Sequence, residues 1–131
     1  MPYAINQQEL DAVFALPAPD RYAHFVKRVD DWEEAWGLAS QGGWVMVGDP
    51  DGCECIPLWP HPAYAEALAT GDWGGGKPTP IALADLLAKW LPGMAKDGFR
   101  VAVFPSRDRK GAVVDPLRLK LDLEIECEQY E

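Results

Sequence analysis

Cysteine, histidine and long apolar runs are scarce in this sequence, and each shortage excludes a class of protein. The 131 residues include three cysteines and two histidines. Because an odd number of thiols cannot complete a disulfide framework, the count fits a reducing cytoplasm better than a secreted domain. No apolar run approaches the roughly 20 residues of a membrane span, and the first residues lack the basic and apolar parts of a signal peptide. We therefore expect a cytoplasmic protein without a membrane segment.

Basic residues are also in short supply. Lysine and arginine number 12 against 21 acidic residues, which gives a formal net charge of −9. Nucleic acid binding needs a basic surface that releases counterions from phosphate, so this balance argues against nucleic acid and against anionic membranes. It suits solubility or a basic protein partner.

The overall composition is that of an ordinary globular protein. Hydrophobic residues make up 48% and charged residues 25% of the chain, close to average usage. A chain of this length most simply forms one domain, here residues 1–131, and buries roughly two thirds of its unfolded surface. No linker or internal repeat divides it.

Helical patterns occupy the first third of the chain. Asn6 and Glu9 stand at capping-box spacing, and the helix that follows them ends at Leu16-Pro17. A second helix begins near Pro19, and its apolar residues recur at i, i+3, i+4 and i+7. This buried stripe is Tyr22, Phe25, Val26 and Val29.

Three short strands are predicted between residues 35 and 58. Turn residues at 40–43 and 49–52 separate them, with Pro50 and Gly52 suited to the second turn. Such short connections allow only antiparallel pairing. We therefore expect an antiparallel three-stranded meander.

Two helices and a hairpin are predicted next. Pro62 is well placed at the first position of a helix, residues 71–79 read as a loop, and a helix from 83 to 91 should end at Pro92. The hairpin spans residues 99–114. The predicted core combines residues from all these segments: Phe25, Val26, Trp44, Leu58, Leu87, Val101 and Val103.

Residues 117–127 alternate between apolar and charged, as a half-buried strand would. Asp115-Pro116 is nevertheless an N-cap followed by proline at N1, so we predict a helix. In a helix Leu117, Leu121 and Ile125 form a stripe that needs a partner, such as a second subunit in a homodimer. The predicted fold class is α+β: two N-terminal helices, the meander, two helices, the hairpin and a C-terminal helix.

Two motifs come close to known chemistry. Gly71 to Lys77 satisfies G-x-x-x-x-G-K, but Pro78 replaces the hydroxyl residue that a phosphate-binding loop needs. Cys53 and Cys55 with His61 or Cys127 could bind a metal, but zinc usually takes four ligands at other spacings. We predict no nucleotide, no metal and no cofactor.

The candidate recognition patch lies where the third strand enters the helix at Pro62. Three prolines stiffen this turn and would lower the entropy lost on binding. The patch consists of Trp59, His61, Tyr64, Trp36 and Trp73. The alternative is that the same side chains lock the strand-to-helix corner, with His61 capping the helix.

The remaining residues suggest no catalytic centre. No serine elbow, Cys–His–acid order or buried carboxylate pair is evident, so no catalytic residue is predicted. His24 is expected on the exposed side of the second helix. Six tryptophans are present, and large aromatic side chains of this kind serve cores, pockets and interfaces.

The sequence resembles the bacterial "domain of unknown function 2750" proteins over nearly its whole length. The matching residues are Arg21-Tyr22 and Phe25, Trp36-Gly37-Leu38, Gly43-Trp44, Ile56 to His61 with Tyr64-Ala65, Trp73, Ile81, Leu83, Trp90-Leu91-Pro92, Val103-Phe104-Pro105 and Tyr130-Glu131. The resemblance implies a small cytoplasmic α+β domain and carries over no catalytic residue.

Two functional hypotheses follow. The first is a non-enzymatic binding or adaptor protein, and one specific version is an immunity-type protein that neutralises a basic toxin. The alternative is a small-molecule-binding protein or enzyme with a pocket at Trp59, His61 and Tyr64. An enclosed site at His61 would favour the ligand, and a flat exposed face would favour the protein partner.

Overall fold

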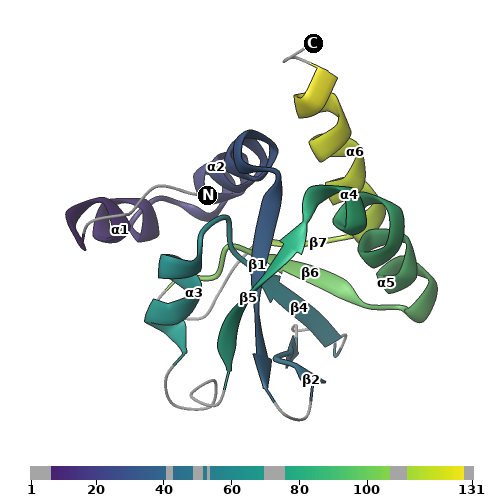
Figure 1. Cartoon of the computed structure of the whole chain (residues 1–131), viewed down its shortest axis with the longest axis horizontal. Helices are drawn as coiled ribbons and strands as arrows, with labels where there is room; N and C mark the ends of the chain where they lie inside the picture. The colour runs from purple at the N-terminus through teal and green to yellow at the C-terminus, as the bar shows by residue number, and fades with distance from the viewer. Residues whose placement is uncertain are drawn as a thin grey trace.

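The computed structural model describes residues 7–40, 43–48, 52, 54–69, 76–106 and 112–128. Helices and strands are mixed along the chain, and the strands form two sheets that are covered by helices (Figure 1). This architecture confirms the predicted α+β class. The helices are α1 (Gln7–Phe14), α2 (Ala18–Trp32), α3 (Pro62–Leu68), α4 (Leu83–Asp85), the π turn η2 (Leu86–Trp90), α5 (Leu91–Asp97) and α6 (Pro116–Glu128). The strands are β1 (Glu34–Ser40), β2 (Gly43–Trp44), β3 (Val47–Gly48), β4 (Glu54–Leu58), β5 (Lys77–Ala82), β6 (Arg100–Val103) and β7 (Ala112–Val114).

The strands form one sheet of order β2-β1-β5 and another of order β3-β4-β6-β7. β4 and β6 run parallel, and the other pairs are antiparallel. The backbones of Trp36 and Trp59 join the two sheets by two hydrogen bonds, of 2.7 and 2.8 Å between N and O. Trp36 and Trp59, two members of the predicted recognition patch, are thus hydrogen-bonded to each other through their backbones.

The meander differs from the prediction because its middle strand is shared between the sheets. Val45 donates to the carbonyl of Leu38 at 2.8 Å, whereas Val47 pairs with Cys55 in β4. β1 and β4 are held on their other edges by β5 and β6, so residues 43–48 bend from one sheet to the other. The predicted cap Asn6, turn residues 41–42 and 49–51, and hairpin turn 107–111 lie outside the described residues.

The loop predicted at 71–79 was wrong at its C-terminal end, since β5 begins at Lys77. Pro78 and Pro80 cannot donate to a ladder, which made the segment read as a loop. β5 is the edge of its sheet, where alternate N–H groups face away from the neighbouring strand and proline is tolerated.

The helix predicted to stop at Pro92 instead continues to Asp97. The turn before the proline is π-helical, and Leu91 donates its N–H to Leu86, five residues back. Because a proline ring clashes with the preceding turn of a regular α-helix, we attribute the continuation to this wider turn. Gly98, in the left-handed region at φ +82°, ends the helix.

The core lies between the sheets and helices α2, α3 and α6. Of the predicted core residues, Phe25, Val26, Leu58, Val101 and Val103 are buried. The other two, Trp44 and Leu87, are only partly buried. Trp44 packs edge-on against Trp90, with ring centroids 4.7 Å apart, and lies so close to Gly37 that an added Cβ there would be 2.9 Å from its ring.

Candidate functional site

The structure brings three members of the predicted patch together in the interior. Trp59 and Tyr64 have no exposed surface, and His61 is 6% exposed. Trp36 is half-buried in β1, and Trp73 lies outside the described residues. A partner protein therefore has no access to Trp59, His61 and Tyr64 in this conformation.

His61 caps helix α3. Its backbone is extended, and its Nδ1 accepts a hydrogen bond from the backbone N–H of Ala63 at 3.0 Å. The imidazole packs edge-on against Trp32 and Tyr64, with centroid distances of 5.6 and 6.2 Å. These contacts are those of a corner residue, which supports the alternative reading of this stretch.

Trp59 and Arg21 hold the segment that follows β6. The indole N–H of Trp59 donates to the carbonyl of Pro105 at 3.0 Å, and Arg21 Nε donates to the carbonyl of Phe104 at 3.0 Å. Phe104 has a positive φ of 52°. Arg21 is not part of the predicted apolar stripe of α2, yet its side chain is buried, because the carbonyls of Leu16 and of Phe104, the latter 83 residues away, accept its N–H groups.

His24 also departs from the surface position predicted for it. It is half-buried, and its ring centroid lies 5.9 Å from that of Phe104. Burial, and then the positive charge of Arg28, lower the pKa of His24 below its ordinary value.

Among the described residues, a pocket between α2, β7 and α6 is the candidate site, which the sequence did not predict. Its volume is about 350 Å³, and its lining is mostly apolar at one side and polar at the other. The lining residues are Ala18, Pro19, Tyr22, Ala112, Val114, Arg118 and Asp122.

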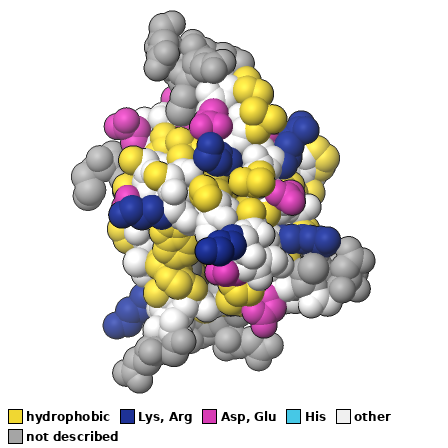
Figure 2. Space-filling model, turned by 90° about the vertical axis from the view of Figure 1, so that its right-hand side faces the viewer, with side chains coloured by type: hydrophobic (Ala, Val, Ile, Leu, Met, Phe, Trp, Pro, Cys, Tyr) yellow, Lys and Arg dark blue, Asp and Glu magenta, His cyan; other side chains and the backbone are white. Residues whose placement is uncertain are grey.

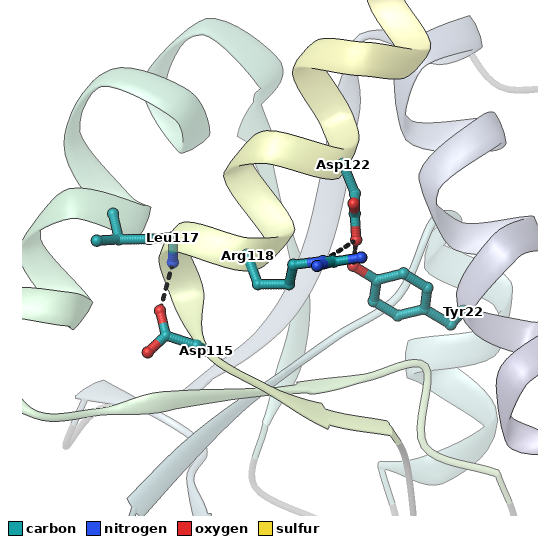
Figure 3. Close-up of polar contacts among 5 residues, drawn as sticks. All are labelled: Tyr22, Asp115, Leu117, Arg118 and Asp122. Carbon is teal, nitrogen blue, oxygen red and sulfur yellow. Dashed lines mark hydrogen bonds and ion pairs between the residues drawn. The ribbon is translucent and has the colours of Figure 1, made fainter.

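Three side chains converge at the polar side of this pocket (Figure 3). The Tyr22 hydroxyl donates to Asp122 Oδ2, and Arg118 Nε lies 3.3 Å from the same oxygen. Burial, followed by the bond to Asp122, raises the pKa of Tyr22 well above its ordinary value, so the phenol stays a donor. The Arg118 side chain is 68% exposed, against 20% for Asp122, which places the guanidinium at the mouth.

Helix α6 carries two of these three side chains, Arg118 and Asp122, and the start of this helix is fixed. Asp115 Oδ1 accepts from the N–H of Leu117 at 2.8 Å (Figure 3), and Pro116 occupies the first position. Leu119 and Leu123 are fully buried, whereas Leu117, Leu121 and Ile125 are 53%, 49% and 46% exposed. The predicted helix and its outward stripe are both confirmed.

A second hollow, of about 450 Å³, lies beside the start of α4. It is lined by Glu33, Ala82, Leu83, Ala84 and Leu87. These lining residues contain no side-chain hydrogen bond like the one between Tyr22 and Asp122. It offers a ligand less to recognise than the pocket beside α6.

The described part of the chain holds neither a metal-binding cluster nor a membrane-spanning helix. No group of three or more His, Cys, Asp or Glu that could hold a metal occurs in the described part of the chain. Cys55 is buried in β4, while Cys53 and residues 71–75 of the glycine-rich segment lie outside the described ranges. No described helix is long and apolar enough to cross a bilayer.

The fold is thus a two-sheet α+β domain with a small pocket beside its last helix. The chain belongs to the family described as "Protein of unknown function (DUF2750)", whose model matches residues 22–123. This confirms the resemblance seen in the sequence, and the matched range includes Tyr22, Arg118 and Asp122. No curated protein and no solved structure matches the chain.

Proposed function

We propose that this protein is a non-enzymatic binding protein whose pocket between α2, β7 and α6 receives an apolar side chain of a basic protein partner. The observation that carries the proposal is the pairing of apolar walls with the Tyr22–Asp122–Arg118 group. Its volume of about 350 Å³ is at the small end of ligand pockets, which span about 300–1,000 Å³. That size suits a side chain better than a large cofactor.

The polar group can fix the orientation of a ligand in the apolar pocket through hydrogen bonds. Asp122 accepts both of its hydrogen bonds on Oδ2, which leaves Oδ1 to accept from a donor on the ligand. Arg118 keeps its terminal N–H groups at the mouth, where they can donate to a carbonyl. A peptide supplies such a donor and such a carbonyl beside the same apolar side chain.

The charge of the whole chain favours a basic partner. A net charge of −9 attracts cationic proteins and raises their association rate. An immunity-type protein directed against a basic toxin is the narrower form of this proposal, and the odd number of cysteines supports a cytoplasmic location. The second candidate function is binding of a small apolar molecule, which the same mostly apolar walls favour.

The test is a titration of isotope-labelled protein with short blocked peptides, followed by amide chemical shifts. A peptide that pairs leucine with lysine should shift the amides of Ala18, Tyr22, Ala112 and Arg118. The same peptide with glutamate in place of lysine should shift these amides less, because its negative charge is repelled by Asp122 and by the negative net charge of the chain.

Two variants of equal chemistry provide the control. Ala18→Phe fills the pocket and should abolish the shifts, whereas Ala84→Phe enters the other hollow and should leave them unchanged. Equal responses to both peptides would contradict a basic partner. Shifts produced by small aromatic molecules but by neither peptide would favour the second candidate.

A further inference from the structure

We infer that the exposed stripe of α6, Leu117, Leu121 and Ile125, docks against the same stripe of a second copy of this chain in antiparallel orientation. The three side chains are about half-exposed while the opposite face of the helix is fully buried. Figure 2 shows the side of the molecule that carries α4 to α6, where hydrophobic side chains emerge among charged ones. Burying such a stripe against another apolar surface is favourable.

The spacing of the stripe suits packing against itself. Its residues are four apart and form one i±4n ridge on the helix surface. Two ridges of this kind interdigitate when the helix axes cross at about −50°, the commonest packing class. A two-fold axis through Leu121 then sets Leu117 of one copy opposite Ile125 of the other.

The charges beside the stripe select the antiparallel orientation. Arg118 and Lys120 precede Leu121, whereas Asp122 and Glu124 follow it. The two-fold axis places the basic half of each helix beside the acidic half of the other copy. In a parallel pair, like charges would face each other and repel.

Within one copy this charge order is unfavourable. The first turn of α6 holds no acidic residue and the last turn no basic one, the reverse of what the helix dipole favours. The pairs Arg118–Asp122 at 3.3 Å and Lys120–Glu124 at 2.9 Å also run in the weaker direction, with the base first. An antiparallel second helix reverses both relationships, because its dipole and its charges run the other way.

The size of the stripe sets the strength of the dimer. A standard interface buries about 800 Å² on each partner, and three half-exposed side chains supply less. We therefore expect reversible dimerisation, with a dissociation constant on the order of 10–100 μM. This inference does not depend on the proposed function, since the three stripe residues are not among those that line the pocket, although Arg118 and Asp122 border both surfaces.

Sedimentation velocity of the full chain over a wide concentration range tests the inference. The wild type should show a reversible monomer–dimer equilibrium. Leu121→Glu sets two carboxylates at the two-fold axis and should leave a folded monomer, checked by circular dichroism and thermal unfolding. Val113→Glu changes a side chain of similar exposure, 41%, away from α6 and should dimerise as the wild type does.

A charge exchange tests the orientation. Lys120→Glu should weaken the dimer at least about tenfold, equivalent to about 1.4 kcal/mol, by placing two acids beside each other. Arg118→Glu should weaken it in the same way, and Arg118→Glu with Glu124→Arg should restore it, because the two-fold axis sets residue 118 of one copy opposite residue 124 of the other. A wild type that stays monomeric throughout overturns the inference and assigns the stripe to a different partner. A dimer that survives Leu121→Glu, or that the double exchange does not restore, overturns the proposed interface.

Discussion

Arg21 donates a hydrogen bond from Nε to the carbonyl oxygen of Phe104 at 3.0 Å, and thereby ties α2 to the residue that follows β6. A second donor of the same guanidinium, Nη1, reaches the carbonyl of Leu16. Arg21 is 6% exposed. One side chain therefore fixes the start of α2 against the sheet.

Removing this guanidinium should destabilise the fold strongly. Arg21→Ala leaves the carbonyls of Leu16 and Phe104 without their donor, and hydrogen bonds to a charged group are worth about 1.5–3 kcal/mol. We expect a loss of that size in urea unfolding. Lys27→Ala, at an exposed position of the same helix, should change stability by less than about 0.5 kcal/mol. Equal effects would show that the buried contact contributes nothing.

His61→Ala should cost about 0.5–2 kcal/mol, the usual effect of removing an N-cap side chain. His61→Asn keeps an acceptor for the Ala63 N–H and should recover part of the loss. Thermal unfolding of both variants measures the difference. A destabilised His61→Ala with the peptide response of the wild type would identify a corner residue, whereas unchanged stability would contradict the cap.

The hydroxyl of Tyr22 predicts a loss of stability at high pH. The folded protein holds this proton more tightly than the unfolded chain, whose tyrosines titrate near the ordinary value of 10.0. The contribution is therefore fully present below about pH 10 and is lost as the pH rises above it. Urea unfolding between about pH 9 and pH 11 should show a steeper loss for the wild type than for Tyr22→Phe. Parallel pH profiles would exclude this origin.

His24 predicts the opposite sensitivity. Because its folded pKa lies below the ordinary value of 6.5, the unfolded chain binds the proton first. Its contribution to stability is present above about pH 6.5 and falls as the pH drops towards the folded pKa. His24→Gln should reduce the loss of stability between about pH 7 and pH 5. An unaltered profile would show that other groups cause the acid sensitivity.

Leu86 and Leu87 offer a matched pair on one helical segment. Leu86 is fully buried and Leu87 only partly so. Leu86→Ala should cost about 2–5 kcal/mol, as truncations in packed cores do, and Leu87→Ala clearly less. Chemical denaturation measures both. A larger loss of stability for Leu87→Ala than for Leu86→Ala would show that the face of the π turn with Leu87, and not the face with Leu86, packs against the core.

Sequence patterns predicted those elements whose signal is local. The apolar stripe of α2 and the Asp115-Pro116 start of α6 depend on interactions between residues that are close in sequence. Both helices form as expected. β5 was missed because Pro78 and Pro80 signal a loop unless the strand is known to lie at an edge. That position depends on β1, about 40 residues earlier.

The candidate site was missed for the same physical reason. Tyr22 was predicted as part of the apolar stripe, and Arg118 and Asp122 were only two of the charged residues that alternate with apolar ones at 117–127. Only the packing of α2 against α6 brings the phenol to the carboxylate. The signal available in the sequence, three prolines around Trp59 and His61, marked a rigid corner and not an accessible surface.

The parallel pairing of β4 with β6 also determines when the domain can fold during its synthesis. On the ribosome, residues 54–58 emerge well before their partner at residues 100–103, and the acceptor of Arg21 follows at residue 104. Leu58 and Trp59 must wait, with their apolar surface uncovered, until nearly four fifths of the chain has been made. A nascent chain halted before residue 100 should therefore remain protease-sensitive and bind chaperones, whereas release of residues 100–106 from the exit tunnel should close the domain.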